Sequence, residues 1–226
     1  MEITVAAAFR AEAEQLSAAM LAVKADDWAR PTRCAPWTTA ELLGHVVTVI
    51  AWIPGMLADQ APEQATVGVV DYYRADERFS SATNAQRIDL ARQRAASAQS
   101  GAALALELDR VWRQIAELCD QEPPGRVVRT RHGDAMVLTD FLTTRIVELG
   151  IHGLDLAAAL NHRPWLTPAA SRILTDLLLG QQHTDPLSEL DWDELTFLSK
   201  ATGRQPLTAD EARRLRLHGI RWLTLG

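Results

Sequence analysis

The 226-residue chain is poor in several residue types, and each shortage excludes a class of protein. It has two cysteines, Cys34 and Cys119, which are too few for a disulfide framework or a cysteine-rich zinc site. Lysine occurs only at Lys24 and Lys200, no block of Lys and Arg is present, and the net charge is −6. Because nucleic-acid binding depends on clustered basic residues, we expect no nucleic-acid partner.

Long hydrophobic runs and glycine-rich phosphate-binding loops are also missing. No uninterrupted apolar run reaches the roughly 18 residues that a membrane span requires, so we expect no membrane association. The N-terminal sequence MEITVAAAFRAEAEQL carries acids, where a signal peptide has a basic end followed by an apolar run. These observations predict a cytoplasmic protein.

The residues that are abundant favour helices. Ala, Leu, Glu, Gln and Arg are all good helix formers, and apolar residues recur at helical spacing, whereas strand-like alternation is scarce. The sequence therefore predicts an all-α fold. Four main helices are expected, at about 4–24, 39–54, 84–120 (long, or broken near Ser100 and Gly101) and 139–160. Four helices of this size in this order predict a four-helix bundle.

Local signals fix some boundaries. Thr38 and Glu41 have the spacing of a capping box, so the second helix should begin near Thr39. The segment 57–82 is read as a long connection with a short helical piece around VVDYYR, and the tyrosines of that piece could line a pocket. The segment EPPGRVVRTRHGD is typical of a loop because of its proline and glycine content.

The character of the sequence changes after about residue 165. Thr167 followed by Pro168 predicts a cap and a helix to about Gly180, and two further helices are expected, at about 192–202 and from Thr208 through Leu217. We therefore divide the chain into a bundle at residues 1–165 and a short, mainly helical C-terminal extension at residues 166–226.

The fourth helix, which contains RIVELGIHGLDLAAAL, carries a polar stripe. Glu148, His152 and Asp155 fall on one face of a helix that is otherwise apolar. A buried carboxylate without a partner costs several kcal/mol, and His45 on the equally apolar second helix is a candidate partner. Two imidazoles and a carboxylate would form the open ligand set of a catalytic zinc, or the facial triad of non-haem iron.

Other side chains near this stripe have two interpretations each. Asp155 could accept a hydrogen bond from His152 and orient it, and Arg145 could pair with Glu148 or meet an anionic ligand. The histidines could also be ordinary hydrogen-bonded core residues. Cys34 could be a nucleophile if a base lies nearby, or a structural thiol. His132 could reach the site from its loop, or lie on the surface.

Three blocks of the chain resemble a known family. The blocks WARPTRCAPWTTAELLGHV (28–46), VVDYYRADERFSSATNAQRIDLAR (69–92) and TTRIVELGIHGLDLAAAL (143–160) are similar to the DinB-like, mycothiol-dependent maleylpyruvate isomerases, over about residues 5–165. The resemblance implies a DinB/YfiT-like four-helix bundle. It also implies a divalent metal bound by His45, Glu148 and His152, with zinc expected first and nickel or iron as alternatives.

The resemblance further implies thiol chemistry. Mycothiol would be the co-substrate, and its thiol would lose its proton on the metal and add to an electrophilic small molecule. In the isomerases the adduct rotates and eliminates the thiol, whereas in S-transferase relatives the adduct is the product. A non-catalytic metal-binding or ligand-binding bundle and a metal-dependent hydrolase are the alternatives. Either a monomer or a homodimer is compatible with the sequence.

The tail departs from the isomerase pattern, since the isomerases carry a separate α/β domain there. An arginine near the end matters in the isomerases, and Arg204 is the nearest match in this sequence. We expect Arg204, or Arg145, to act as a catalytic residue by binding a substrate carboxylate.

Overall fold

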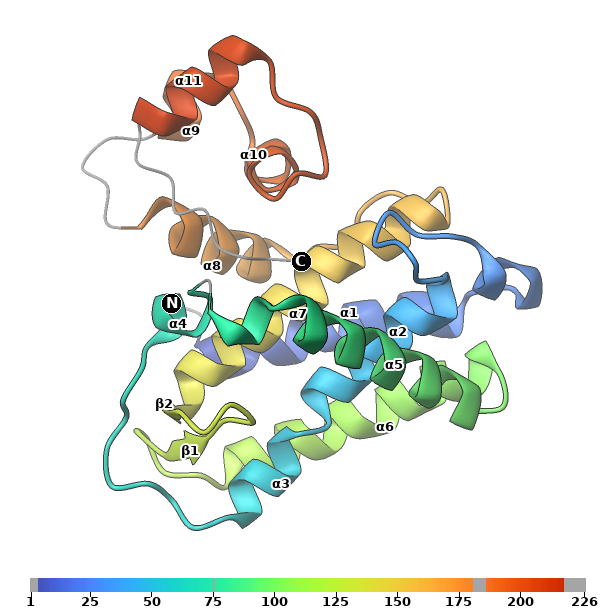
Figure 1. The fold of residues 1–226 in the computed structure, drawn as a ribbon, viewed down its shortest axis with the longest axis vertical. Coiled ribbons are helices and arrows are strands. Elements are labelled where there is room, and N and C mark those ends of the chain that lie inside the picture. Colours follow the sequence, from blue (N-terminus) through green and yellow to red (C-terminus); the bar gives the residue numbers. More distant parts are fainter. Residues whose placement is uncertain (1–3, 75, 181–185, 218–226) are drawn as a thin grey trace.

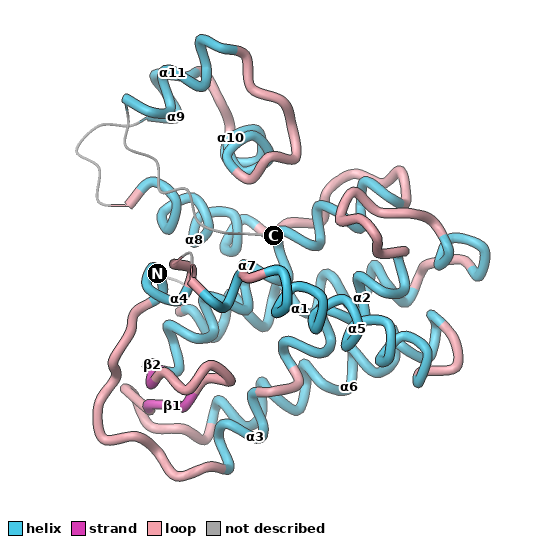
Figure 2. The backbone as a smooth tube through the Cα atoms, viewed as in Figure 1, coloured by secondary structure: helices cyan, strands magenta, loops and turns pink. Residues whose placement is uncertain are grey.

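The computed structural model describes residues 4–74, 76–180 and 186–217. This part of the chain is mainly helical, and one small two-stranded sheet holds its only strands (Figures 1 and 2). The prediction of a mainly helical fold is therefore confirmed.

The main core lies between four long helices. The helix α1 (Val5–Leu21) packs on α6 (Gly101–Asp120) and on α7 (Leu138–Ala159), and α2 (Thr39–Ile50) also packs on α6 and α7. Among the largest fully buried apolar side chains are Phe9, Leu16, Leu42, Leu43, Ile50, Leu108 and Phe141. Burial of this apolar surface is the main force that holds the helices together.

The start of α2 follows the predicted capping box, but its end differs from the prediction. The Thr38 backbone N–H donates to the Glu41 carboxylate at 2.8 Å, and the Thr38 hydroxyl accepts from the Glu41 N–H. The helix ends at Ile50 rather than near Pro54, and α3 (Ile53–Ala58) follows. Proline has no N–H to donate, so Pro54 is tolerated in the first turn of α3. It would remove a backbone hydrogen bond if α2 continued through it.

The stretch Thr39–Ala58 is long and apolar enough, by length and composition alone, to cross a membrane, and an 18-residue window within it has a mean hydropathy of 1.5. In the structure, 61% of that window is buried inside the protein. Its hydrophobicity therefore matches that of a core helix, which the expectation based on uninterrupted runs did not anticipate.

The predicted third helix is broken where the sequence indicated. It forms α5 (Ser81–Ser97) and α6, and the Ser100 hydroxyl caps the start of α6. The helix α5 packs closely on α2. A Cβ atom added to Gly44 of α2 would lie 2.5 Å from the carbonyl oxygen of Ala91 in α5. The absence of a side chain at Gly44 thus permits this close approach.

The segment predicted as a loop after α6 contains the first strand and the turn of a hairpin. Its strands are β1 (Val127–Arg129) and β2 (Ala135–Val137), which pair antiparallel. Strands of three residues are too short to show an alternating pattern, which is why the sequence did not reveal them. The connection before α5 contains α4 (Val69–Tyr72), the short helical piece that the sequence predicted.

The C-terminal part adds helices on one side of this core (Figure 1). They are α8 (Pro168–Leu179), α9 (Pro186–Leu190), α10 (Glu194–Ala201) and α11 (Ala209–Leu217), of which α9 was not predicted. The helix α8 packs on α1 and α7, and α10 packs on α8. The carboxylate of Glu12 in α1 accepts hydrogen bonds from the Thr167 N–H and hydroxyl, at 2.9 and 2.7 Å. The boundary near residue 165 stays a prediction.

Candidate metal centre

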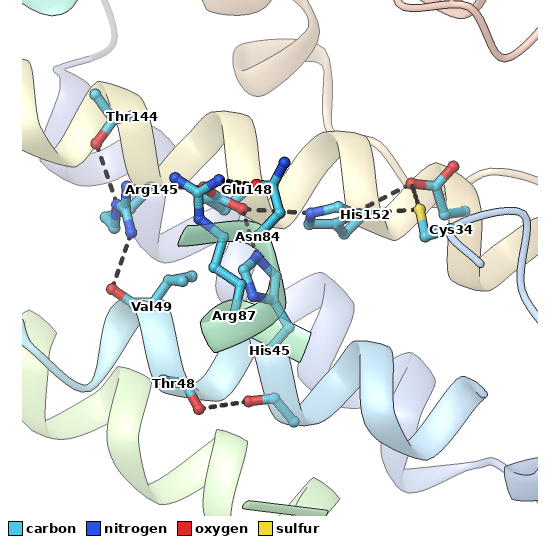
Figure 3. A network of polar contacts seen from close by, with 12 residues as sticks. Cys34, His45, Thr48, Val49, Asn84, Arg87, Thr144, Arg145, Glu148 and His152 are labelled. Carbon is cyan, nitrogen blue, oxygen red and sulfur yellow. Dashed lines mark hydrogen bonds and ion pairs between the residues drawn. The ribbon is translucent and has the colours of Figure 1, made fainter. Parts of the chain in front are cut away.

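The three predicted metal ligands lie together. His45 comes from α2, and Glu148 and His152 come from α7 one turn apart (Figure 3). Oε2 of Glu148 lies 3.2 Å from Nε2 of His45 and 3.4 Å from Nε2 of His152. One possible ligand atom from each residue lies within 4.8 Å of the others. Two imidazole nitrogens and a carboxylate oxygen at this spacing suit a divalent transition metal.

Asp155 holds the imidazole of His152 from the other side. Its Oδ2 lies 3.1 Å from Nδ1 of His152, and its side chain is fully buried. This contact places a proton on Nδ1 and turns Nε2 toward Glu148 and His45, as is usual for a metal-binding histidine. Arg204 holds Asp155 in turn, because its Nε and Nη2 donate to the two carboxylate oxygens at 3.1 and 2.8 Å.

A second group of possible ligands shares His152. Sγ of Cys34 lies 3.9 Å from Nδ1 of His152 and donates to Oδ2 of Asp155 at 3.1 Å. Because Nδ1 carries the proton directed at Asp155, this side of the ring has no lone pair for a metal. The donor chemistry therefore favours the set of His45, Glu148 and His152, and Cys34 acts as a hydrogen-bond donor to Asp155.

The ionisation of the three ligands is compatible with metal binding. Burial would raise the pKa of Glu148, but hydrogen bonds from His152 and His45 and the nearby charge of Arg145 hold it well below its ordinary value. Burial lowers the pKa of His45, which keeps that ring neutral. Burial would also lower the pKa of His152, but hydrogen bonds to Asp155, Cys34 and Glu148 hold it well above its ordinary value. A metal would therefore compete with one proton on His152.

Arg145 lies behind Glu148 in the protein interior, with only 1% of its surface exposed. Its Nη1 donates to the Val49 carbonyl at 3.0 Å, and its Nη2 donates to the Tyr72 hydroxyl at 3.3 Å and lies 3.8 Å from Oε1 of Glu148. This guanidinium thus balances Glu148 and links α7 to α2. Catalytic roles for Arg145 and Arg204 stay predictions.

A cavity of about 550 Å³ opens on the three ligands. Tyr72 and Tyr73 lie on the cavity wall, and His132 reaches the same cavity from the turn of the hairpin. Thr202, Gly203 and Arg204 supply a wall from the C-terminal part.

The sequence did not indicate several other lining residues. Trp37 stacks on His45, with ring centroids 4.8 Å apart, and Trp52, Arg87 and Arg131 lie further along the wall. They come from separate segments, and a single arginine or tryptophan gives no periodic signal that would mark it as part of a site.

Comparison with known proteins identifies a family for the part of the chain that contains the candidate ligands. The profile of the mycothiol maleylpyruvate isomerase N-terminal domain family matches residues 9–157, which include all three candidate ligands. Two uncharacterised proteins from two strains of Mycobacterium tuberculosis are 28% identical over 180 residues. The alignment covers 78% of this chain and 63% of each relative, and no solved structure matches. The chain belongs to the mycothiol maleylpyruvate isomerase N-terminal domain family.

Proposed function

We propose that the protein is a metal-dependent enzyme that activates a low-molecular-weight thiol for addition to an electrophilic small molecule. The observation that carries this proposal is the convergence of His45, Glu148 and His152 at a cavity wall, with Asp155 fixing the ring of His152. Zinc is the first choice for the metal, because it favours a three-ligand site with one open position. Nickel and iron are alternatives.

Each residue of the site has a defined part in this proposal. A divalent ion bound by His45, Glu148 and His152 would deprotonate a thiol that coordinates it. Asp155 and Arg204 orient His152, and Arg145 keeps Glu148 ionised. The cavity is large enough for two small reactants, so its walls can hold the sulfur atom beside the electrophilic carbon.

The family name supports mycothiol as the thiol and isomerisation as one reaction. Transfer of the thiol is the second reaction that we consider. In a transfer, sulfur bonds to the electrophilic carbon and the thiol proton ends on the adjacent carbon. In an isomerisation, the same carbon–sulfur bond forms and breaks again, so the thiol is regenerated. The packing of α1, α2, α6 and α7 supports assigning a DinB-like four-helix bundle to this chain as well. The whole activity is part of the proposal, because the chain spans 63% of the length of the curated relatives.

Metal analysis of the purified full chain tests the metal centre. After equilibration with zinc, nickel or ferrous ion and removal of excess metal, the wild type should retain a divalent ion. The variants His45→Ala and His152→Ala should lose most of it, whereas His162→Ala, in an exposed turn after α7, should match the wild type. Equal metal content in all four proteins would overturn the proposal.

A turnover assay tests the thiol chemistry. The metal-loaded chain is mixed with mycothiol and a model electrophile, and the loss of free thiol and the formation of adduct are followed. Thiol-dependent turnover by the wild type, absent in His152→Ala, is expected. Binding of thiol without turnover would instead indicate a binding protein, and turnover of an ester without thiol would indicate a hydrolase.

A further inference from the structure

The cavity has an excess of positive charge that the metal centre does not require. Among the described residues that line it, Glu148 is the single carboxylate, whereas five arginines line the same walls. These arginines are Arg33, Arg87, Arg131, Arg145 and Arg204. The chain as a whole has a net charge of −6, so this concentration of arginine is local. A bound divalent cation would increase the excess.

Three of the five arginines have carboxylate partners within the protein. Arg204 forms a two-point contact with Asp155, and Arg33 lies 3.7 Å from Oδ1 of the same carboxylate. Nη2 of Arg145 lies 3.8 Å from Oε1 of Glu148, and the guanidinium also donates hydrogen bonds to neutral oxygen atoms. Each of the three therefore has a carboxylate nearby in the absence of any ligand, and Arg33 and Arg204 share the same one.

Arg87 and Arg131 differ from these three, because neither forms an ion pair with any carboxylate in the described part of the chain. Arg87 donates to the Asn84 side chain at 2.6 Å and to the Arg78 carbonyl, and its guanidinium has further donors. Arg131 lies over the ring of Trp52, with its guanidinium carbon 4.5 Å from the ring centroid. Stacking on an aromatic face leaves the edge of a guanidinium available for a planar anion.

The two arginines lie on the Arg145 side of the metal ligands. Arg131 stacks on Trp52, and the centroid of the Trp52 ring lies 6.0 Å from the guanidinium carbon of Arg145. Arg87 is close enough to Glu148 and Arg145 for both charges to influence its pKa. Cys34, Asp155 and Arg204 lie at the other side, next to His152, and Figure 3 shows Arg145 and Cys34 on opposite sides of the ligands. A ligand held by Arg87 and Arg131 would thus lie beside the metal position without displacing Arg204 from Asp155.

The pKa values of His132 and Arg87 are lowered mainly by burial, and neighbouring arginine charges lower them further. Burial, Arg131, Arg78 and Arg87 together lower the pKa of His132 to about 4, so this ring is neutral at pH 7. Burial is also the main cause that lowers the pKa of Arg87. An anion placed between Arg87 and Arg131 would remove part of this electrostatic cost.

We propose that Arg87 and Arg131 bind a carboxylate, or another compact anionic group, of one of the two reactants. This inference rests on the proposed function, because it assigns part of the cavity to a reactant that lies beside the metal. The anionic group belongs to the electrophile or to the thiol, and both sources present the same chemistry to the two guanidinium groups.

Binding measurements on the full chain test this proposal without turnover. For the electrophile, the probes are fumarate and its neutral amide, fumaramide. For the thiol, they are 3-mercaptopropionate and its neutral amide. Binding is measured by calorimetry with the metal-free and the zinc-loaded protein, for the wild type and for Arg87→Gln, Arg131→Gln and Arg87→Lys. The control is Arg129→Gln, whose side chain contacts the Gly133 carbonyl and does not line the cavity.

The anionic member of at least one probe pair should bind the wild type more tightly than its amide. Arg87→Gln and Arg131→Gln should each weaken that binding by about tenfold or more, and Arg87→Lys by less, while amide binding and the control stay unchanged. The pair that shows the difference identifies the reactant that carries the anion. Equal binding of anion and amide in both pairs, or anion binding unaffected by both glutamine variants, would overturn the inference. A failure of the proposed function would appear separately, as absent metal or absent thiol turnover.

Discussion

Oδ2 of Asp155 lies 3.1 Å from Nδ1 of His152, so a fully buried carboxylate sets the orientation of a candidate metal ligand. Replacing Asp155 with Asn removes the charge that holds the proton on Nδ1, and it also leaves Arg204 without its carboxylate. We expect the zinc affinity of Asp155→Asn to fall by roughly 10- to 100-fold. A competition titration with a chelator at constant pH measures this change.

The control for this experiment is Asp89→Asn, which removes one negative charge from an exposed position of α5. Its zinc affinity should equal that of the wild type. If Asp155→Asn also binds zinc like the wild type while keeping its thermal stability, Asp155 does not orient His152 for a metal.

Glu12 predicts a pH dependence of stability. Burial raises its pKa above the ordinary value, although the hydrogen bonds from Thr167 oppose this effect. The folded state therefore binds more protons than the unfolded state between the two pKa values, and stability falls as pH rises through this window. Glu12→Gln keeps an acceptor for Thr167 but carries no charge, so its melting temperature at pH 7 should exceed that of the wild type by a few degrees.

The difference between Glu12→Gln and the wild type should shrink as the pH is lowered toward 4, because the wild-type carboxyl then becomes neutral. Thermal unfolding at several pH values measures this. Glu14→Gln, an exposed position on the same helix, should show no such trend. A constant difference at all pH values would contradict the assignment. Glu12→Ala should be destabilised by about 1–3 kcal/mol, since it leaves the Thr167 N–H unpaired.

The grouping of the candidate metal ligands could be predicted largely from the sequence, for a physical reason. Glu148 and His152 are four residues apart in a helix with almost no solvated face, so helical periodicity alone places them together. The pairing of that helix with His45 could not come from periodicity, because it depends on tertiary packing. The resemblance of three separate blocks to one family supplied that information.

The contacts of the arginines that line the cavity could not be predicted from helical periodicity. Arg204 was expected to meet a substrate carboxylate, whereas in the structure it holds Asp155, a carboxylate 49 positions away in the chain. Arg87 and Arg131 come from α5 and from a hairpin that the sequence did not reveal. Their relation to the metal ligands depends on how closely α5 and the hairpin approach α2 and α7, which no local pattern encodes.

His132 offers a spectroscopic view of the cavity that does not depend on a metal. Its pKa of about 4 arises from burial and from the charges of Arg131, Arg78 and Arg87. Removing Arg131 by substitution with Gln, or adding a bound anion, should raise that pKa, because either change reduces the repulsion of the protonated ring. An NMR titration of the imidazole measures the value in each case. If the pKa of His132 is the same in Arg131→Gln and in the wild type, the charge of Arg131 does not act on this end of the cavity.

Gly44 connects the stability of the fold with the proposed anion site. Its added Cβ atom would lie 2.5 Å from the Ala91 carbonyl oxygen, a backbone atom that cannot rotate away. Gly44→Ala should therefore push α5 from α2, cost about 1–3 kcal/mol of stability and weaken anion binding by moving Arg87. Chemical denaturation and calorimetry measure the two effects. In Gly55→Ala the new Cβ atom meets nothing within 4 Å, so this variant should be at least as stable as the wild type. If Gly44→Ala were as stable as Gly55→Ala and bound the anion as tightly, the close packing of α5 on α2 would not be what positions Arg87.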